Sequence, residues 1–231
     1  PVNIAIYDAD NDDRPDVFVS FDGEQVLSRY EDADNWQQVV GGGSGPFVFG
    51  DLDGDGREDT IEAHSNDGVF VWRRNLGNGA FDDAEIFHMG AIPSDVATGD
   101  LDADGALDVL VAAYEDDEVS WFANDLSLRA VISTEAGPES VRAADLDDDG
   151  DLDVVVAAFE ADRVVWHEND GGSFGPAIEI GTMDGPISIR GADFDHDGDA
   201  DLLVASSEDD TVRWFENEGG EFVEHILTTE A

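Results

Sequence analysis

Cysteine and lysine are both missing from this 231-residue sequence. Without cysteine, the chain forms no disulfide, no thiolate metal site and no cysteine nucleophile. Without lysine, its ten basic residues are all arginine, and 57 acidic residues bring the formal net charge to −47. Such a charge repels nucleic acid phosphates and anionic membrane surfaces and attracts cations. We therefore expect no nucleic acid partner and no membrane insertion.

Long apolar segments are missing as well. No run reaches the length of a transmembrane helix, no stretch has convincing helical periodicity, and no charged-then-apolar leader opens the chain. The chain starts at Pro1 rather than at methionine, so we expect a processed product or a part of a longer protein. With 41% hydrophobic residues, there is still enough apolar material for a sizeable core.

A nine-residue acidic motif recurs along the chain. It reads DADNDDRPD from Asp8, DLDGDGRED from Asp51, DLDADGALD from Asp100, DLDDDGDLD from Asp145 and DFDHDGDAD from Asp193. The copies start 43 to 49 residues apart. Other residues keep the same register: a proline before each motif, a tryptophan after four of them (Trp72, Trp121, Trp166, Trp214) and an asparagine three residues later (Asn75, Asn124, Asn169, Asn217). The chain is therefore a five-repeat protein.

The first repeat departs from this pattern. It has Asp13 where the other motifs have glycine, Arg29 at the tryptophan position and Asp32 at the asparagine position.

Each repeat reads as four short strands. In the fourth, these are SVRAAD (140–145), LDVVVAAF (152–159), RVVWHEN (163–169) and PAIEIG (176–181). The second is continuously apolar, which predicts burial on both faces. Four strands in 40 to 50 residues are typical of a β-propeller blade. We predict an all-β fold, a five-bladed β-propeller of four-stranded antiparallel blades, forming one domain over residues 1–231 with blades at about 1–45, 46–92, 93–137, 138–185 and 186–231.

The acidic motif has the composition of a calcium loop between the first and second strands. Alternate carboxylates at positions 1, 3 and 5 converge inside a tight turn, and the glycine after them lets the backbone bend. A shell of hard oxygen ligands suits Ca²⁺ better than Mg²⁺ or zinc. An EF-hand needs glutamate at position 12, where four of the five motifs have valine. The closing carboxylate is instead the ninth-position aspartate, so we expect a strand–loop–strand site.

These repeats resemble FG-GAP (VCBS-type) repeats, the calcium-binding propeller blades of integrin α-subunit heads and of many bacterial surface proteins. The resemblance covers essentially the whole chain and implies about five Ca²⁺ ions, one per repeat, with the first site the most doubtful because of Asp13. By this resemblance the ligands are Asp8, Asp10, Asp12 and Asp16; Asp51, Asp53, Asp55 and Asp59; Asp100, Asp102, Asp104 and Asp108; Asp145, Asp147, Asp149 and Asp153; and Asp193, Asp195, Asp197 and Asp201.

Two functions fit these observations. The first is a non-catalytic, calcium-stabilised adhesion or self-assembly module at the cell surface or outside the cell, with protein partners or copies of itself. The second is a lectin-like glycan binder. We interpret the in-register tryptophans as inter-blade core, with sugar stacking as the alternative, whereas Trp36 lies off register and is the better candidate for a surface contact. No catalytic constellation is evident, and we expect no enzyme.

Overall fold

The computed structural model describes residues 3–9, 14–20, 27–32, 35–39, 45–64, 68–88 and 92–229. Strands form nearly all of the regular structure in these ranges, and a single 3-10 turn, η1 (Tyr114–Asp116), interrupts them. The described segments therefore contain no helix of the length that a bilayer crossing needs. The predicted all-β class is confirmed.

The strands form five four-stranded antiparallel sheets, each within one predicted repeat and each in sequence order from edge to edge. The first sheet contains β1 (Asn3–Tyr7), β2 (Asp16–Ser20), β3 (Leu27–Asp32) and β4 (Asn35–Val39). The second contains β5 (Phe47–Gly50), β6 (Asp59–His64), β7 (Val69–Arg73) and β8 (Glu85–His88). The third contains β9 (Asp95–Gly99), β10 (Asp108–Ala113), β11 (Glu118–Phe122) and β12 (Leu128–Ser133). The fourth contains β13 (Pro138–Ala144), β14 (Asp153–Ala158), β15 (Arg163–His167) and β16 (Ile178–Thr182). The fifth contains β17 (Pro186–Ala192), β18 (Asp201–Ser206), β19 (Thr211–Asn217) and β20 (Phe222–Thr229).

In the third and fourth repeats, the second strand is the most buried strand. Every residue of β10 (DVLVAA) and of β14 (DVVVAA) is buried. A β-strand turns successive side chains to opposite faces, so an uninterrupted apolar run needs cover on both sides. The sequence prediction of two-sided burial is confirmed for these strands.

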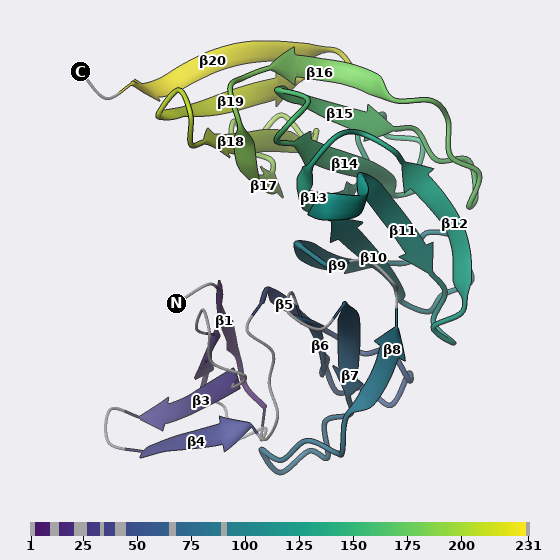
Figure 1. Ribbon diagram of the computed structural model, residues 1–231, viewed down its shortest axis with the longest axis vertical. Coiled ribbons are helices and arrows are strands. Elements are labelled where there is room, and N and C mark those ends of the chain that lie inside the picture. Colours follow the sequence, from purple (N-terminus) through teal and green to yellow (C-terminus); the bar gives the residue numbers. More distant parts are fainter. Residues whose placement is uncertain are drawn as a thin grey trace. The chain divides into compact units, whose positions relative to one another are not determined.

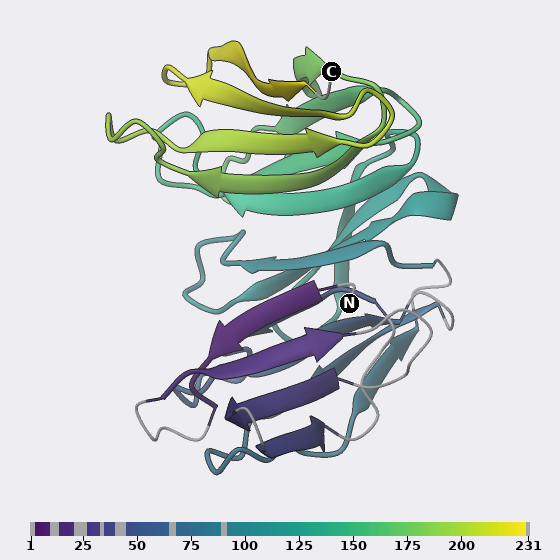
Figure 2. The same cartoon turned by 90° about the vertical axis from the view of Figure 1, so that its left-hand side faces the viewer.

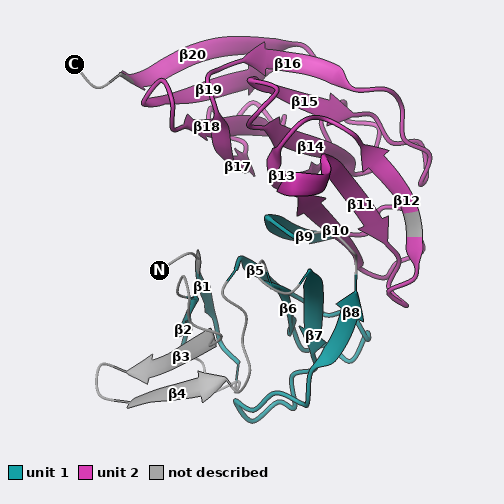
Figure 3. Ribbon diagram, viewed as in Figure 1, with its two compact units in different colours: residues 1–98 teal, residues 99–231 magenta. Residues whose placement is uncertain are grey.

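Two compact units divide the chain, residues 1–98 and residues 99–231 (Figure 3). In the first unit, Phe18 of the first sheet and Phe47 of the second belong to one buried cluster. The ring of Phe18 also meets that of Phe49 edge-on, with 4.8 Å between centroids. Aromatic packing therefore joins the first two repeats. The single domain over residues 1–231 stays a prediction.

In the second unit, the fourth and fifth sheets stack face to face, with β13 beside β17 (Figures 1 and 2). Their shared core combines one face of the fourth sheet (Val155, Ala157, Val164, Trp166) with the opposite face of the fifth (Ile189, Leu202, Val204, Phe215). The fourth repeat thus turns this face toward the fifth repeat, and its β13 contacts β10 of the third repeat.

A polar cluster interrupts the apolar pattern in the second repeat. Glu62 is 2% exposed, and its Oε1 lies 3.2 Å from Arg73 Nε. The Thr60 hydroxyl donates to the same oxygen at 3.1 Å, and His64 Nε2 lies 3.5 Å from Oε2. The third and fifth repeats have valine and phenylalanine in place of Glu62 and Arg73. An ion pair therefore occupies a core position here.

Candidate metal centres

The acidic motif lies where the sequence predicts it, between the first and second strand of each repeat. It joins β5 to β6, β9 to β10, β13 to β14 and β17 to β18. In the first repeat, Asp8 and Asp16 flank the loop, and Asp10, Asp12 and Asp13 lie outside the described residues. The strand–loop–strand arrangement therefore agrees with the prediction.

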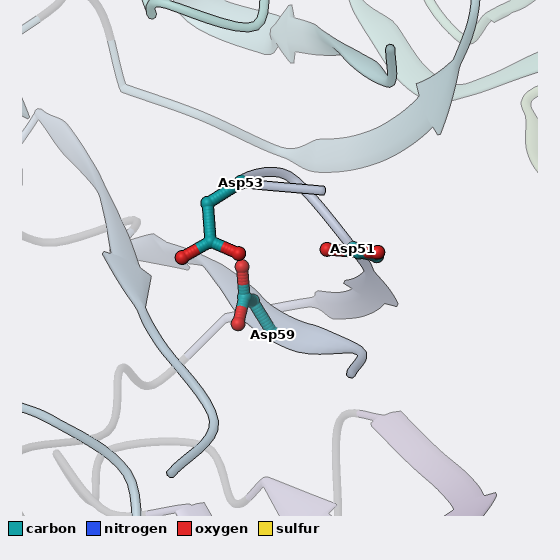
Figure 4. A group of neighbouring side chains, drawn as sticks. All are labelled: Asp51, Asp53 and Asp59. Atoms are coloured by element: carbon teal, nitrogen blue, oxygen red, sulfur yellow. The ribbon is translucent and has the colours of Figure 1, made fainter. Parts of the chain in front are cut away.

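Carboxylates converge in four of these loops. In each, three aspartates contribute one oxygen to a group whose members all lie within 4.8 Å of one another, close enough for one cation to contact all three. Figure 4 shows the group of Asp51, Asp53 and Asp59, with Asp51 opposite the other two carboxyl groups. The four groups are Asp51, Asp53, Asp59; Asp100, Asp102, Asp108; Asp145, Asp147, Asp153; and Asp193, Asp195, Asp197.

Not every predicted ligand belongs to these groups. The fifth-position aspartates Asp55, Asp104 and Asp149 lie outside them, as does the ninth-position Asp201 of the last repeat. Asp55 instead pairs with Arg57, two residues later. The fifth-position carboxylates also accept backbone N–H groups two residues on, for example Ala106 to Asp104 at 2.9 Å. The assignment of all 20 aspartates as ligands stays a prediction.

The ninth-position aspartate is buried in all five repeats, at 0–3% exposed. One carboxylate oxygen accepts the N–H of the second loop residue, as in Leu146 to Asp153 Oδ2 at 3.0 Å. In the second to fifth repeats, the other oxygen accepts the N–H of the in-register asparagine, as in Asn169 to Asp153 Oδ1 at 2.9 Å. In the second repeat, the Trp72 indole N–H also donates to Asp59 at 2.9 Å. This aspartate therefore connects the loop to the end of the third strand.

Burial raises the pKa of three of these carboxyl groups, those of Asp59, Asp108 and Asp153. The pKa of Asp153 rises to about 6, because burial outweighs its two backbone hydrogen bonds and because Asp147 and Asp149 add negative charge nearby. Burial is also the main cause that raises the pKa values of Asp59 and Asp108. The negative charge of Asp53 raises the pKa of Asp59 further, and that of Asp102 raises the pKa of Asp108 further. Each loop thus concentrates negative charge that a cation would neutralise.

Backbone hydrogen bonds hold the loop around the first aspartate. Asp100 accepts the N–H groups of Asp104 at 3.1 Å and Gly105 at 3.0 Å, and Asp51 makes the equivalent pair. Other carboxylate oxygens have no hydrogen-bond partner although they are buried: one oxygen each of Asp102, Asp145 and Asp147. A buried oxygen without a donor is costly unless a cation contacts it. The donor set therefore fits a hard cation.

The loop needs left-handed backbone at two positions. At position 6, Gly56, Gly105, Gly150 and Gly198 have φ between +85° and +114°, and an added Cβ would meet no atom within 4 Å. Glycine is thus required by conformation, not by space. Position 4 is also left-handed, although its residues differ: Gly54, Ala103, Asp148 and His196. Of these, His196 is exposed.

Two of the in-register asparagines, Asn169 and Asn217, connect neighbouring repeats, a role that the sequence did not reveal. The Asn169 side-chain amide donates to Leu152 O of its own repeat at 2.9 Å and to Leu101 O of the preceding loop at 2.8 Å. Asn217 does the same with Ala200 O and Leu146 O. In the sequence, only the fixed distance from a tryptophan marked each asparagine. The contact itself depends on the fold, because the fold brings the preceding loop within reach of the side-chain amide.

Three of the four in-register tryptophans are core residues. Trp72, Trp121 and Trp166 are 4–7% exposed, which confirms their interpretation as core and leaves no ring face for a sugar. Trp214 of the last repeat is half-buried and stacks on His225 at 4.6 Å. Trp36 lies in β4, but its side chain is outside the described part of the structure.

A family model described as "FG-GAP-like repeat" matches the chain three times, over residues 51–111, 100–156 and 145–204. Each match begins at the first aspartate of one motif and ends in the strand after the next. No curated protein sequence matches the chain.

Several solved structures share the fold. BBS1N, crystallised in complex with ARL6DN, gives a TM-score of 0.67 at 17% identity over 98% of this chain. An Agrocybe aegerita lectin that recognises non-reducing terminal N-acetylglucosamine gives 0.62 at 20% identity over 99%. The V. cholerae biofilm matrix protein Bap1 gives 0.57 at 15% over 95%. The chain spans 66% of each of the first two proteins and 38% of the third. At these identities the likeness concerns the fold alone.

Proposed function

This chain belongs to the family of FG-GAP-like repeat proteins, and we propose that it is a calcium-stabilised, non-catalytic module for adhesion or self-assembly outside the cell. The observation that carries the proposal is the recurrence of one carboxylate cluster in four successive repeats, each at the same turn. The sequence contains five acidic loops of this kind, which are more than a single binding event needs. We infer that the ions serve the scaffold.

Calcium suits the clusters better than other common metals. Their donors are carboxylate oxygens, which hard cations prefer, and the loops contain no cysteine. Ca²⁺ accepts six to eight oxygens in loose geometry, so loops with three converging carboxylates and others nearby fit it, whereas Mg²⁺ demands a strict octahedron. The ninth-position aspartates would join the loop, the third strand and the ion.

The expected stabilisation is large for a domain of this size. Extracellular modules bind Ca²⁺ with a Kd of roughly 0.1–1 mM. At about ten times that concentration, one site adds about 1.4 kcal/mol, and five add about 7 kcal/mol. Typical domains have a total stability of about 5–15 kcal/mol. Five divalent ions would also bring the formal charge from −47 to −37. Sites of this affinity fill outside cells and stay empty at cytosolic calcium.

We further infer that the five sheets are blades of a β-propeller. Support comes from the face-to-face packing of the fourth and fifth sheets and from the fold shared with the solved structures. An array of sheets with repeated loops suits a binding or structural role. Bap1, named as a biofilm matrix protein, has a related fold.

Calcium binding is tested by calorimetric titration of chelator-treated protein. We expect about five sites, and Asp145→Asn with Asp147→Asn should remove one of them. The matched control is Asp116→Asn, which removes an exposed charge outside the loops. Sedimentation in calcium and in chelator then tests assembly. Absence of calcium binding, or a strict monomer under both conditions without adhesion to any surface, would contradict the proposed function.

A glycan-binding function is the second candidate. It is favoured by a cleft of about 520 Å³ between β13 and β17, which is lined by Arg142 and Arg190 at equivalent register positions of the two strands. The lectin of related fold supports the same idea. Glycan-array binding that weakens in Arg142→Ala with Arg190→Ala, or in Trp36→Ala, would support it, and a blank array in calcium would count against it.

A further inference from the structure

A continuous series of hydrogen bonds joins the acidic loops of the third and fourth repeats, which lie within one compact unit. The Leu101 N–H donates to Asp108 Oδ2 at 3.1 Å. The Leu101 carbonyl accepts the side-chain amide of Asn169 at 2.8 Å, and the Asn169 backbone N–H donates to Asp153 Oδ1 at 2.9 Å. Asp108 belongs to the carboxylate group of the third repeat and Asp153 to that of the fourth. One leucine and one asparagine therefore link the two groups.

The same series continues from the fourth loop to the fifth. The Leu146 N–H donates to Asp153 Oδ2 at 3.0 Å, and its carbonyl accepts the side-chain amide of Asn217 at 2.8 Å. The Asn217 backbone N–H donates to Asp201 Oδ1 at 2.8 Å. Asp153 thus uses one oxygen in the link to the third loop and the other in the link to the fifth. Both junctions are built from the same bonds at the same register positions.

The turn that follows each asparagine lies against the preceding loop. The Gly172 N–H donates to Asn169 Oδ1 at 2.8 Å, and a Cβ added at Gly172 would lie 3.2 Å from Asp102 Cβ. A Cβ added at Gly220 of the fifth repeat would lie 3.6 Å from Asp147 Cβ. Asp102 and Asp147 each have one buried oxygen without a hydrogen-bond partner in the described part of the chain. The turn of one repeat therefore closes over a carboxylate of the loop before it.

We propose that Asn169 and Asn217 are positioning residues that each serve two calcium sites, so that adjacent sites bind calcium cooperatively. This inference rests on the calcium-binding part of the proposed function and adds a coupling between its sites. Asp153 is held in place when the fourth loop binds its ion, and Asp153 in turn holds the N–H of Asn169. The amide of Asn169 then holds the Leu101 carbonyl, so the third loop is already ordered when it binds its own ion. Ordering achieved by the first ion lowers the entropic cost of binding the second.

Electrostatics acts in the opposite direction. Each bound Ca²⁺ reduces the net negative charge of −47 that attracts the next ion. At physiological ionic strength the Debye length is about 8 Å, so salt screens much of this long-range effect, whereas it screens a buried hydrogen bond far less. At physiological salt we therefore expect positive coupling between adjacent sites, of about fivefold in Kd. The coupling should be weaker at low salt.

Nuclear magnetic resonance can follow the sites one by one. Gly105, Gly150 and Gly198 occupy the sixth position of three successive loops, so the amide signal of each reports calcium binding to its own loop. In wild type, we expect the three signals to shift over a narrower range of calcium concentration than a one-site curve spans. Asp145→Asn with Asp147→Asn disables the fourth loop and should raise the Kd reported by Gly105 about fivefold.

Asn169→Ala separates the hydrogen-bonded link from the loss of charge. In this background, disabling the fourth loop should leave the Kd of the third loop nearly unchanged, whereas a purely electrostatic effect would persist. The matched control is Ser173→Ala, which changes an exposed neutral residue of the same turn and should keep the full effect. Asn217→Ala should uncouple the fourth loop from the fifth and leave the third and fourth coupled. Thermal melting in calcium checks that each variant folds, and the wild-type curves decide the question without any substitution.

Two results would overturn the coupling: one-site curves at all three glycines, or an equal rise in the Kd of the third loop with and without Asn169→Ala. In both cases calcium still binds, so the calcium-stabilised scaffold of the proposed function stands. If calcium shifts none of the three glycine signals, both the coupling and the proposed calcium binding are wrong.

Discussion

The side-chain amide of Asn217 donates to Leu146 O at 2.8 Å, although 71 residues separate them in the sequence. The same amide donates to Ala200 O at 3.1 Å, and its oxygen accepts the N–H of Gly220 at 2.8 Å. One asparagine thus holds its own loop, its own hairpin and the loop of the preceding repeat. The fourth and fifth repeats are therefore joined by this hydrogen bond as well as by apolar packing.

Asn217→Ala should lower the free energy of unfolding by about 2–4 kcal/mol, because two carbonyl groups lose a buried donor. Urea denaturation in calcium measures the change. The control is Asn78→Ala, whose side chain is exposed and accepts only from Ala80. Equal effects of the two substitutions would show that the inter-repeat hydrogen bond adds nothing.

The two left-handed loop positions predict effects of opposite sign. Gly105→Ala should destabilise the protein by about 1–2 kcal/mol, because alanine disfavours a φ of +90° even where its Cβ meets nothing. Ala103→Gly, two residues earlier, should stabilise it by up to about 1 kcal/mol, because it relieves the same strain at φ +57°. Thermal melts of both variants in chelator measure the loop without its ion. Destabilisation by both would contradict this account.

The buried ion pair of the second repeat should depend on both partners. Arg73→Phe alone should cost about 3–5 kcal/mol, because it leaves the Glu62 carboxylate buried without its cation. The double variant Glu62→Val with Arg73→Phe introduces the pair found at these positions in the third and fifth repeats. It should recover most of that loss. Urea denaturation of Glu62→Val, Arg73→Phe and the double variant gives the coupling energy between the two residues. Additive effects of the two single substitutions would argue against an interaction between them.

The raised pKa of Asp153 predicts a pH dependence of the metal-free protein. The folded pKa of about 6 exceeds the ordinary value of 3.8, so the unfolded chain loses this proton first as pH rises. Stability should fall between about pH 4 and pH 6, by about 3 kcal/mol for this group. Calcium binds the ionised form, so its stabilising effect should be larger at about pH 7.5 than at about pH 5.

Thermal melts with calcium and with chelator at both pH values measure this linkage. Asp153→Asn cannot titrate at this position, so its chelator melts should depend less steeply on pH than those of wild type. Equal pH slopes for the two proteins would assign the dependence to other groups.

The repeats, their strands and their loops could be predicted from the sequence because each depends on local pattern. The run Asp153–Ala158 is apolar for its full length after the aspartate, and burial on both faces follows directly. Gly150 marks a turn for the same local reason. The tryptophan register indicated a core position, and the burial of Trp166 confirms it.

Other features depend on the three-dimensional arrangement and have no local signal. The contact of Asn169 with Leu101 joins different repeats. The left-handed position 4 is held by glycine, alanine, aspartate or histidine, so no residue type marks it. Glu62 reads as one more acidic residue in an acidic chain, and only its burial beside Arg73 distinguishes it. The sequence indicated which carboxylates are near one another, but not that Asp55 lies outside the group formed by Asp51, Asp53 and Asp59.

The asparagine side chains reach only main-chain atoms of the neighbouring loop: Leu101 O for Asn169 and Leu146 O for Asn217. Every residue has a carbonyl group, so this contact does not distinguish one loop sequence from another. Whole repeats from the middle of the chain should therefore be interchangeable. Duplicating or reordering them would preserve each junction, which offers a simple route to propellers and arrays of different length.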